Sequence, residues 1–126
     1  MEKKNVEHFL NLYSEFEKQC FKIAHKMKAY NNDYAFIDYF HIDTESKSVI
    51  GEGEYRWGCG SNEIDYYYVD FDVNLLGYTD EELDAYVDKL YQEKLERESA
   101  ANKKAEEESL AYRRAQYEKL KKELGL

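Results

Sequence analysis

The 126-residue sequence contains no proline, and it has only six glycines, two cysteines and one tryptophan. A chain without proline can form long helices, because proline removes a backbone N–H and interrupts a helix. No apolar run approaches the length that spans a bilayer, and the first residues, MEKKNVEHFL, lack the apolar core of a signal peptide. These absences predict a soluble protein with a cytoplasmic location, where cysteines stay reduced.

Motifs that would indicate a reaction are also lacking. There is no phosphate-binding glycine loop, no GxSxG, no CxxC and no calcium-loop spacing. A zinc site made from Cys20, His25, His41 and Cys59 would match no zinc-motif spacing. We interpret the stretch GCG at 58–60 as a hairpin turn, the alternative being an enzyme with Cys59 as nucleophile. We therefore expect a protein that is not an enzyme and that uses no cofactor or metal.

The acidic residues are unevenly distributed along the chain, whose net charge is −9. Residues 31–80 contain eleven acidic and two basic residues, a net of −9, whereas residues 1–30 have a net of +2 and residues 81–126 a net of −2. A negative surface repels DNA, RNA and anionic membranes. The segment 31–80 therefore predicts either a surface for a basic partner or a sheet face that is only solvated.

Residues 3–30 have apolar side chains at alternating spacings of three and four, which predicts an amphipathic helix. This stripe consists of Val6, Phe9, Tyr13, Phe16, Cys20, Ile23 and Met27, broadened by Leu10 and Ala24. The heptad-like seam could pack on a sheet, on another helix or on a second copy of the chain. Within it, we expect Cys20 to be buried as a small hydrophobic residue.

Residues 34–77 are predicted to form a three-stranded antiparallel meander with strands at 34–43, 48–57 and 63–73. The sequences TESK and GCGSN supply the two turns. Gly51 and Gly53 share one face of the second strand, which indicates a bulge or a close approach of the N-terminal helix.

The face of the meander that carries most charge is predicted from the two-residue period of a strand. Alternation places carboxylates and tyrosines of the second and third strands on the same face. This candidate partner-binding face consists of Glu52, Glu54, Tyr66, Tyr68, Asp70 and Asp72.

From Thr79 onward the sequence predicts a long helix. The sequence TDEE is a capping box, with Thr79 as N-cap and Glu82 as its reciprocal partner. The apolar face weakens after Leu95, so a helix over 79–124 either projects or folds back after a break near residues 99–103. We predict an α+β fold with a core at residues 1–95 and a charged helical extension at residues 96–126.

The layout resembles that of small acidic proteins encoded by bacteriophages, among them the anti-CRISPR inhibitors of RNA-guided nucleases. The resemblance lies in the meander ending in IDYYYVDFDV and the terminal helix beginning YTDEELDAYVDKL. Several such inhibitors are DNA mimics that cover the groove reading the protospacer-adjacent motif, although the balanced charge of the last helix here departs from a pure mimic.

The resemblance implies a non-enzymatic inhibitor in the host cytoplasm that blocks a basic nucleic-acid-binding site on a host protein, such as a CRISPR effector nuclease. The net charge of −9 argues against direct contact with nucleic acid or an anionic membrane. The candidate binding face described above would supply the contact. The alternative is a structural or assembly protein that oligomerises through its helices, as a homodimer or coiled coil rather than a monomer.

Overall fold

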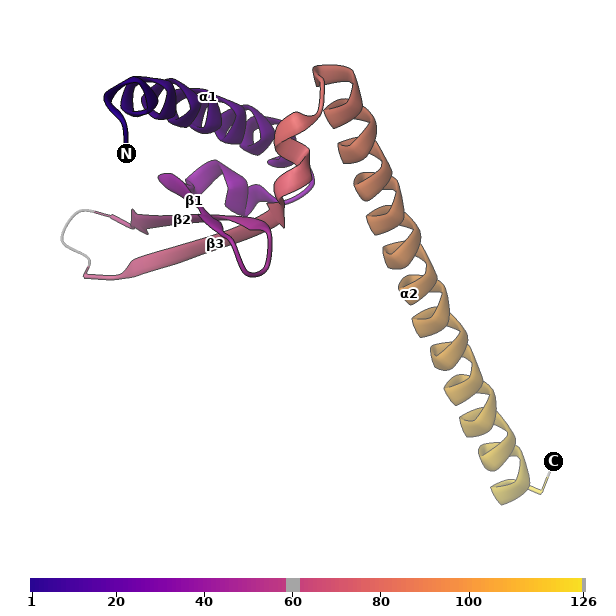
Figure 1. The fold of residues 1–126 in the computed structure, drawn as a ribbon. Helices are drawn as coiled ribbons and strands as arrows, with labels where there is room; N and C mark the ends of the chain where they lie inside the picture. Colours follow the sequence, from indigo (N-terminus) through magenta and orange to yellow (C-terminus); the bar gives the residue numbers. More distant parts are fainter. Residues whose placement is uncertain (59–61, 126) are drawn as a thin grey trace. The chain divides into compact units, whose positions relative to one another are not determined.

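The computed structural model describes residues 1–58 and 62–125, and it confirms the predicted α+β class (Figure 1). The chain divides into two compact units, Met1–Asp88 and Lys89–Leu126. The elements are α1 (Lys3–Met27), the 3-10 helix η1 (Asn32–Phe36), β1 (Tyr39–Asp43), β2 (Ser48–Arg56), β3 (Ile64–Asp72), the 3-10 helix η2 (Val73–Gly77) and α2 (Asp80–Glu123).

The three strands form one antiparallel sheet in the order β1-β2-β3, as the sequence predicts. Ser48 of β2 pairs with both Asp43 of β1 and Asp72 of β3, and the ladders run without interruption from there. The TESK turn ends at Lys47, whose φ of 54° lies in the left-handed region. Gly58 has a φ of 73°, while Cys59 and Gly60 of the predicted GCG turn lie outside the described residues.

The predicted first strand, 34–43, is wrong in its first half, because η1 precedes the strand and β1 begins only at Tyr39. The side chain of Asn31 accepts a hydrogen bond from the backbone N–H of Asp33 at 3.0 Å, and this cap starts the 3-10 turn. Tyr34 and Ile37, three residues apart, are both buried. The run YAFI therefore buries apolar groups at a helical spacing rather than at the two-residue spacing of a strand.

Other boundaries differ from the predicted ones by one to three residues. The first helix ends at Met27 instead of residue 30, and the N–H of Asn31 donates to the Met27 carbonyl in the turn that follows, at 2.9 Å. The third strand ends at Asp72, since its carboxylate accepts from the N–H of Asn74 at 2.8 Å and so caps η2.

The close approach predicted at Gly51 and Gly53 is present, but no atom of the N-terminal helix is among the nearest: η1 approaches Gly53, and side chains of β1, β3 and Ile37 approach Gly51. A Cβ on Gly53 would lie 1.8 Å from the carbonyl oxygen of Phe36. A Cβ on Gly51 would lie 2.8 to 2.9 Å from side chains, among them that of Phe40. Figure 1 shows η1 between α1 and the sheet. The uninterrupted pairing of β2 with β3 means that neither glycine marks a bulge.

The core lies between the sheet and the helices of the first unit. Its buried residues are Cys20, Ile23, Ala24, Met27, Tyr34, Ile37, Phe40, Val49, Val69, Phe71, Leu75 and Leu83. The predicted burial of Cys20 is confirmed, and burial raises the pKa of its thiol to about 12. Such a thiol stays protonated at neutral pH, so it packs as a small hydrophobic group and does not act as a nucleophile.

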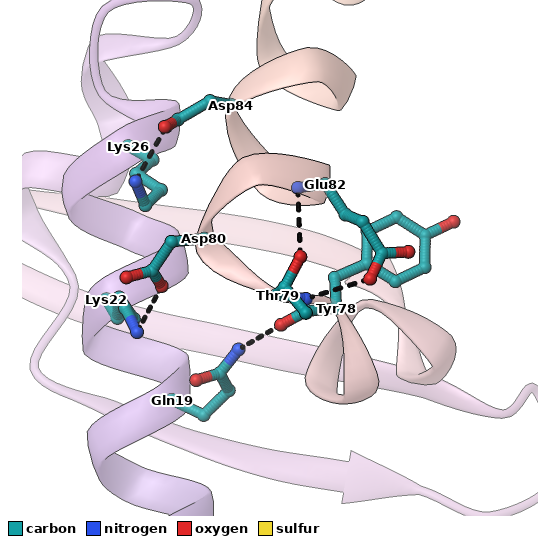
Figure 2. Close-up of polar contacts among 8 residues, drawn as sticks. All are labelled: Gln19, Lys22, Lys26, Tyr78, Thr79, Asp80, Glu82 and Asp84. Atoms are coloured by element: carbon teal, nitrogen blue, oxygen red, sulfur yellow. Dashed lines mark hydrogen bonds and ion pairs between the residues drawn. The ribbon is translucent and has the colours of Figure 1, made fainter.

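The predicted capping box at the start of α2 is confirmed (Figure 2). The N–H of Thr79 donates to Oε1 of Glu82, and the N–H of Glu82 donates to Oγ1 of Thr79, both at 3.2 Å. This reciprocal pair satisfies two of the backbone donors that a helix start leaves without partners.

The first turns of α2 are tied to α1 by polar contacts (Figure 2). Lys22 forms an ion pair with Asp80, and Lys26 forms one with Asp84 at 2.6 Å. The Lys22 contact holds the pKa of Asp80 below its ordinary value, and Nε2 of Gln19 donates to the Tyr78 carbonyl at 3.3 Å. These contacts place α2 against α1 within the first unit.

The remainder of α2 belongs to the second unit and is a single helix as far as Glu123. The alternative of a break near residues 99–103 is therefore wrong. Its large apolar side chains from Leu95 onward are exposed, by 41% at Leu95 and by 55% at Leu120. No helix in the described part of the chain has both the length and the apolar character needed to cross a membrane.

Candidate functional site

The outer face of the β2–β3 hairpin brings together four of the six candidate residues. Glu52 lies directly opposite Tyr68, and Glu54 lies directly opposite Tyr66. Side chains opposite each other on one face of a sheet have Cβ atoms about 4.5 to 5.5 Å apart. Two carboxylates are thus each next to a tyrosine ring, and both rings are more than half exposed.

Asp70 and Asp72 lie farther along β3 on the same face. Asp70 is opposite Ile50, and Asp72 is opposite Ser48. The carboxylate of Asp72 already accepts the hydrogen bond that caps η2. Asp70 therefore extends the negative row, while Asp72 combines a surface charge with a structural contact.

Two residues of the site were not predicted from the sequence, Tyr39 and Asp38. The hydroxyl of Tyr39, on β1, donates to Oε2 of Glu52 at 2.5 Å, and the backbone N–H of Glu54 donates to Oδ2 of Asp38 at 3.1 Å. Tyr39 lies opposite Glu52 in the β1–β2 ladder. Alternation along YFHID marks Tyr39 as outward-facing, but only the register of β1 against β2 shows its neighbour.

The hydrogen bond between Tyr39 and Glu52 has an electrostatic consequence. Its acceptor is a carboxylate, so it raises the pKa of Tyr39 above the ordinary value. The phenol therefore remains a neutral donor at physiological pH, and it holds the Glu52 carboxylate in a fixed orientation. Tyr39 also stacks on His41, with ring centroids 6.4 Å apart.

These side chains surround a hollow of about 480 Å³ on the outer face. The residues that line it include Asp38, Tyr39, Glu52, Glu54, Tyr66 and Tyr68. Pockets that hold small ligands measure roughly 300 to 1,000 Å³. The hollow is therefore large enough to receive one long side chain of a partner.

The negative charge of this face is not neutralised within the described part of the chain. The ion pairs there join Lys4 to Glu2, Lys22 to Asp80 and Lys26 to Asp84. No described lysine or arginine forms an ion pair with Glu52 or Glu54. Arg56 lies on the same face of β2 and is exposed. The hollow consequently has carboxylates that lack an ion-pair partner among the described residues, and these lie beside aromatic rings.

The arrangement suits a cation better than other ligands. Carboxylates accept charge-assisted hydrogen bonds from guanidinium or ammonium groups, and tyrosine faces attract the same groups through their ring electrons. Among the described residues, no group of three or more His, Cys, Asp and Glu side chains could hold a metal ion, and Cys59 is not among them.

Comparison with known proteins gives no relative for this chain. No family model matches it, and neither a curated protein nor a solved structure does so. The functional inference therefore depends on the residues of the site.

Proposed function

We propose that this protein is a non-enzymatic inhibitor whose outer sheet face occupies a basic nucleic-acid-binding site on another protein. One observation carries the proposal: Glu52 and Glu54 lie among exposed tyrosines around a hollow of about 480 Å³, and no described lysine or arginine forms an ion pair with either carboxylate. The resemblance to phage-encoded inhibitors suggests a CRISPR effector nuclease of the host as the partner.

A phosphate-binding groove offers the groups that this face lacks. Such grooves present arginine and lysine side chains, and the guanidinium of arginine binds carboxylates with the same paired geometry that it uses for phosphates. The Cα atoms of Glu52 and Glu54, two residues apart on one strand, are about 6.6 Å apart along the strand, and both side chains lie on the same face. They can therefore engage two neighbouring basic side chains that otherwise contact successive phosphates.

The tyrosines supply the contact area that charges alone do not. Tyr66 is 74% exposed and Tyr68 is 57% exposed, so much of each ring is available for burial. Buried aromatic side chains contribute a large share of the affinity at protein interfaces, whereas complementary charge mainly raises the association rate. We therefore propose that the carboxylates speed association with the partner, and that Tyr39, Tyr66 and Tyr68 slow its dissociation.

The proposal is tested by capture from a nuclease-treated bacterial lysate, with the tagged protein as bait and mass spectrometry as readout. We expect a nucleic-acid-binding protein to be retained at low salt and reduced at moderate salt, since charge attraction is screened. An added DNA duplex should compete with the bait for the captured protein. Retention that duplex DNA leaves unchanged would contradict occupation of a nucleic-acid site, and recovery of the protein only with itself would favour the assembly alternative.

A pair of matched variants tests whether the captured protein binds the outer face of the sheet. Replacing Glu52 and Glu54 by glutamine should slow association with the captured partner by roughly tenfold and flatten its salt dependence. The control replaces Glu106 and Glu107, in the second unit, by glutamine and changes net charge equally. Equal effects of the two double variants would show that only net charge matters, which would overturn the assignment to this face.

A further inference from the structure

The helix α1 has two halves that differ in what covers them. Residues of its C-terminal half, such as Cys20, Ile23 and Met27, are buried. In the N-terminal half, the large apolar side chains are between 44% and 59% exposed, namely Val6, Phe9, Leu10, Leu12 and Tyr13. The apolar stripe that packs on the core therefore continues beyond the core for about three turns without cover.

The uncovered half has the residue pattern of a helix that pairs with another helix. With Val6 at position a of a heptad, Phe9 and Phe16 are at d, Tyr13 is at a, Leu10 is at e and Leu12 is at g. The remaining positions, b, c and f, carry only Lys4, Glu7, His8, Asn11, Ser14, Glu15 and Lys18. The rings of Phe9, Tyr13 and Phe16 form a row, with successive centroids 6.3 Å and 6.0 Å apart.

We propose that α1 pairs with α1 of a second copy of this chain, antiparallel, through residues 3–17. In a pair related by a twofold axis, the same patch of both copies meets, so each flank of one helix faces the same flank of the other. If Phe9 lies level with Tyr13 of the second copy, Val6 lies level with Phe16. Four apolar layers then form along the seam.

Charge complementarity identifies the occupant as a second copy. In this register Lys3 lies within one turn of Glu17 of the second copy, on the flank of the e positions, and the twofold axis repeats the pair. Neither side chain has an ion-pair partner in the described part of the chain. Opposite charges at flanking positions set the partner and the orientation of paired helices.

The parallel arrangement fits the same residues less well. In a parallel pair, a g position faces the e position five residues later on the partner, which places Leu12 beside Glu17 and Asn5 beside Leu10. In the antiparallel pair, Leu10 lies beside Leu10 of the second copy and Leu12 lies beside Leu12. The antiparallel pair therefore buries leucine against leucine and leaves the charged residues to pair with each other.

This inference does not rest on the proposed function. The pairing uses the N-terminal half of α1, whereas the inhibitor proposal uses the outer face of the sheet. A monomeric protein could still block a partner, and a dimer could form without any partner.

The test measures the mass of the purified full chain by sedimentation velocity from about 1 to about 500 µM, the range in which a dimer of ordinary affinity dissociates. We expect a concentration-dependent dimer. Leu10→Glu places two carboxylates side by side at the twofold axis and should raise the dissociation constant by roughly a hundredfold. Lys3→Glu should raise it roughly five- to tenfold, because each of the two symmetric pairs becomes repulsive.

A charge swap makes the test specific for the register. The double variant Lys3→Glu with Glu17→Lys restores opposite charges across the interface, so its dissociation constant should return to within about twofold of the original. Lys4→Glu, at an outward position, is the matched control and should leave the dimer intact. Circular dichroism should show unchanged helix content in all variants. Lys3→Glu and Lys4→Glu place an acidic residue in the first turn, which favours the helix, and the changes at positions 10 and 17 exchange residues of similar helix propensity.

Two results would overturn the proposal. The first is a monomer throughout the concentration range. The second is a dimer that neither Leu10→Glu nor Lys3→Glu weakens, or that the double variant fails to restore, which would place the contact elsewhere.

Discussion

The two faces of the sheet differ in composition although the same three strands form both. On the inner face, Val49, Val69 and Phe71 are buried, and Gly53 leaves room for η1. On the outer face, carboxylates and tyrosines of β2 and β3 remain largely accessible. The difference shows that the inner face builds the core, whereas the outer face stays accessible. Substitutions on the two faces should therefore separate stability from binding.

The largest loss of stability is expected for Gly53→Ala. The new Cβ would lie 1.8 Å from the carbonyl oxygen of Phe36, which belongs to the backbone and cannot rotate away. We expect the free energy of unfolding to fall by at least about 3 kcal/mol, measured by urea denaturation. The control is Gly77→Ala, where a Cβ would meet nothing within 4 Å. Similar effects of the two substitutions would show that η1 does not pack on Gly53.

Val49→Ala should produce the next largest effect. Val49 is fully buried on the inner face, so removing its methyl groups should lower the free energy of unfolding by about 2.5 kcal/mol. Tyr66→Thr, on the outer face, keeps a strand-forming residue and should cost less than about 1 kcal/mol. If the two losses were equal in a denaturant titration, the distinction between the two faces would fail.

The core should also lose stability at alkaline pH through Cys20. Its pKa is about 12 in the folded protein and 9.0 when exposed, so below pH 9 the thiol is protonated in both states. Above pH 9 the unfolded state ionises while the folded state keeps the proton, and stability falls until pH passes 12. The loss at pH 11 should be on the order of 2 kcal/mol. Cys20→Ala should flatten the pH dependence of unfolding between pH 9 and 11; an unchanged slope would contradict this cause.

The smallest effect on stability is expected for Tyr39→Phe on the outer face. The substitution removes an exposed hydrogen bond to Glu52, so the melting temperature should change by no more than about 1 °C. The partner captured by the outer face should nevertheless dissociate faster, because the Glu52 carboxylate loses its fixed orientation. When tyrosine ionisation is followed by ultraviolet absorbance, the variant should show one fewer tyrosine with a raised pKa. A larger change in melting temperature with an unchanged dissociation rate of the partner would show that Tyr39 stabilises the fold and does not act in binding.

Local patterns allowed much of this fold to be predicted from the sequence. The two-residue period along IDYYYVDFDV is a property of the strand itself, and it correctly separated Tyr68 and Asp70 from Val69 and Phe71. The capping box at Thr79 is equally local. The stripe of α1 predicted a helix, but which half is covered depends on where η1 and η2 pack against it.

What the sequence did not reveal depends on contacts between distant segments. The apolar run at 34–37 suits a strand as well as a turn, and the side chain of Asn31 decides in favour of η1. Tyr39 joins the site only through the register of β1 on β2, which no residue of β1 specifies alone. The neighbour of Gly53 was misassigned for the same reason.

The alternation of the β2–β3 hairpin also bears on how such a protein could change over generations. Four outward positions of the hairpin are 52, 54, 66 and 68. Each is next in sequence to an inward position that packs against η1 or the core. A lineage that follows a changing partner can therefore accept substitutions at every second residue while the residues between them stay fixed. Substitutions that follow successive partners would then be found at every second residue of these two strands.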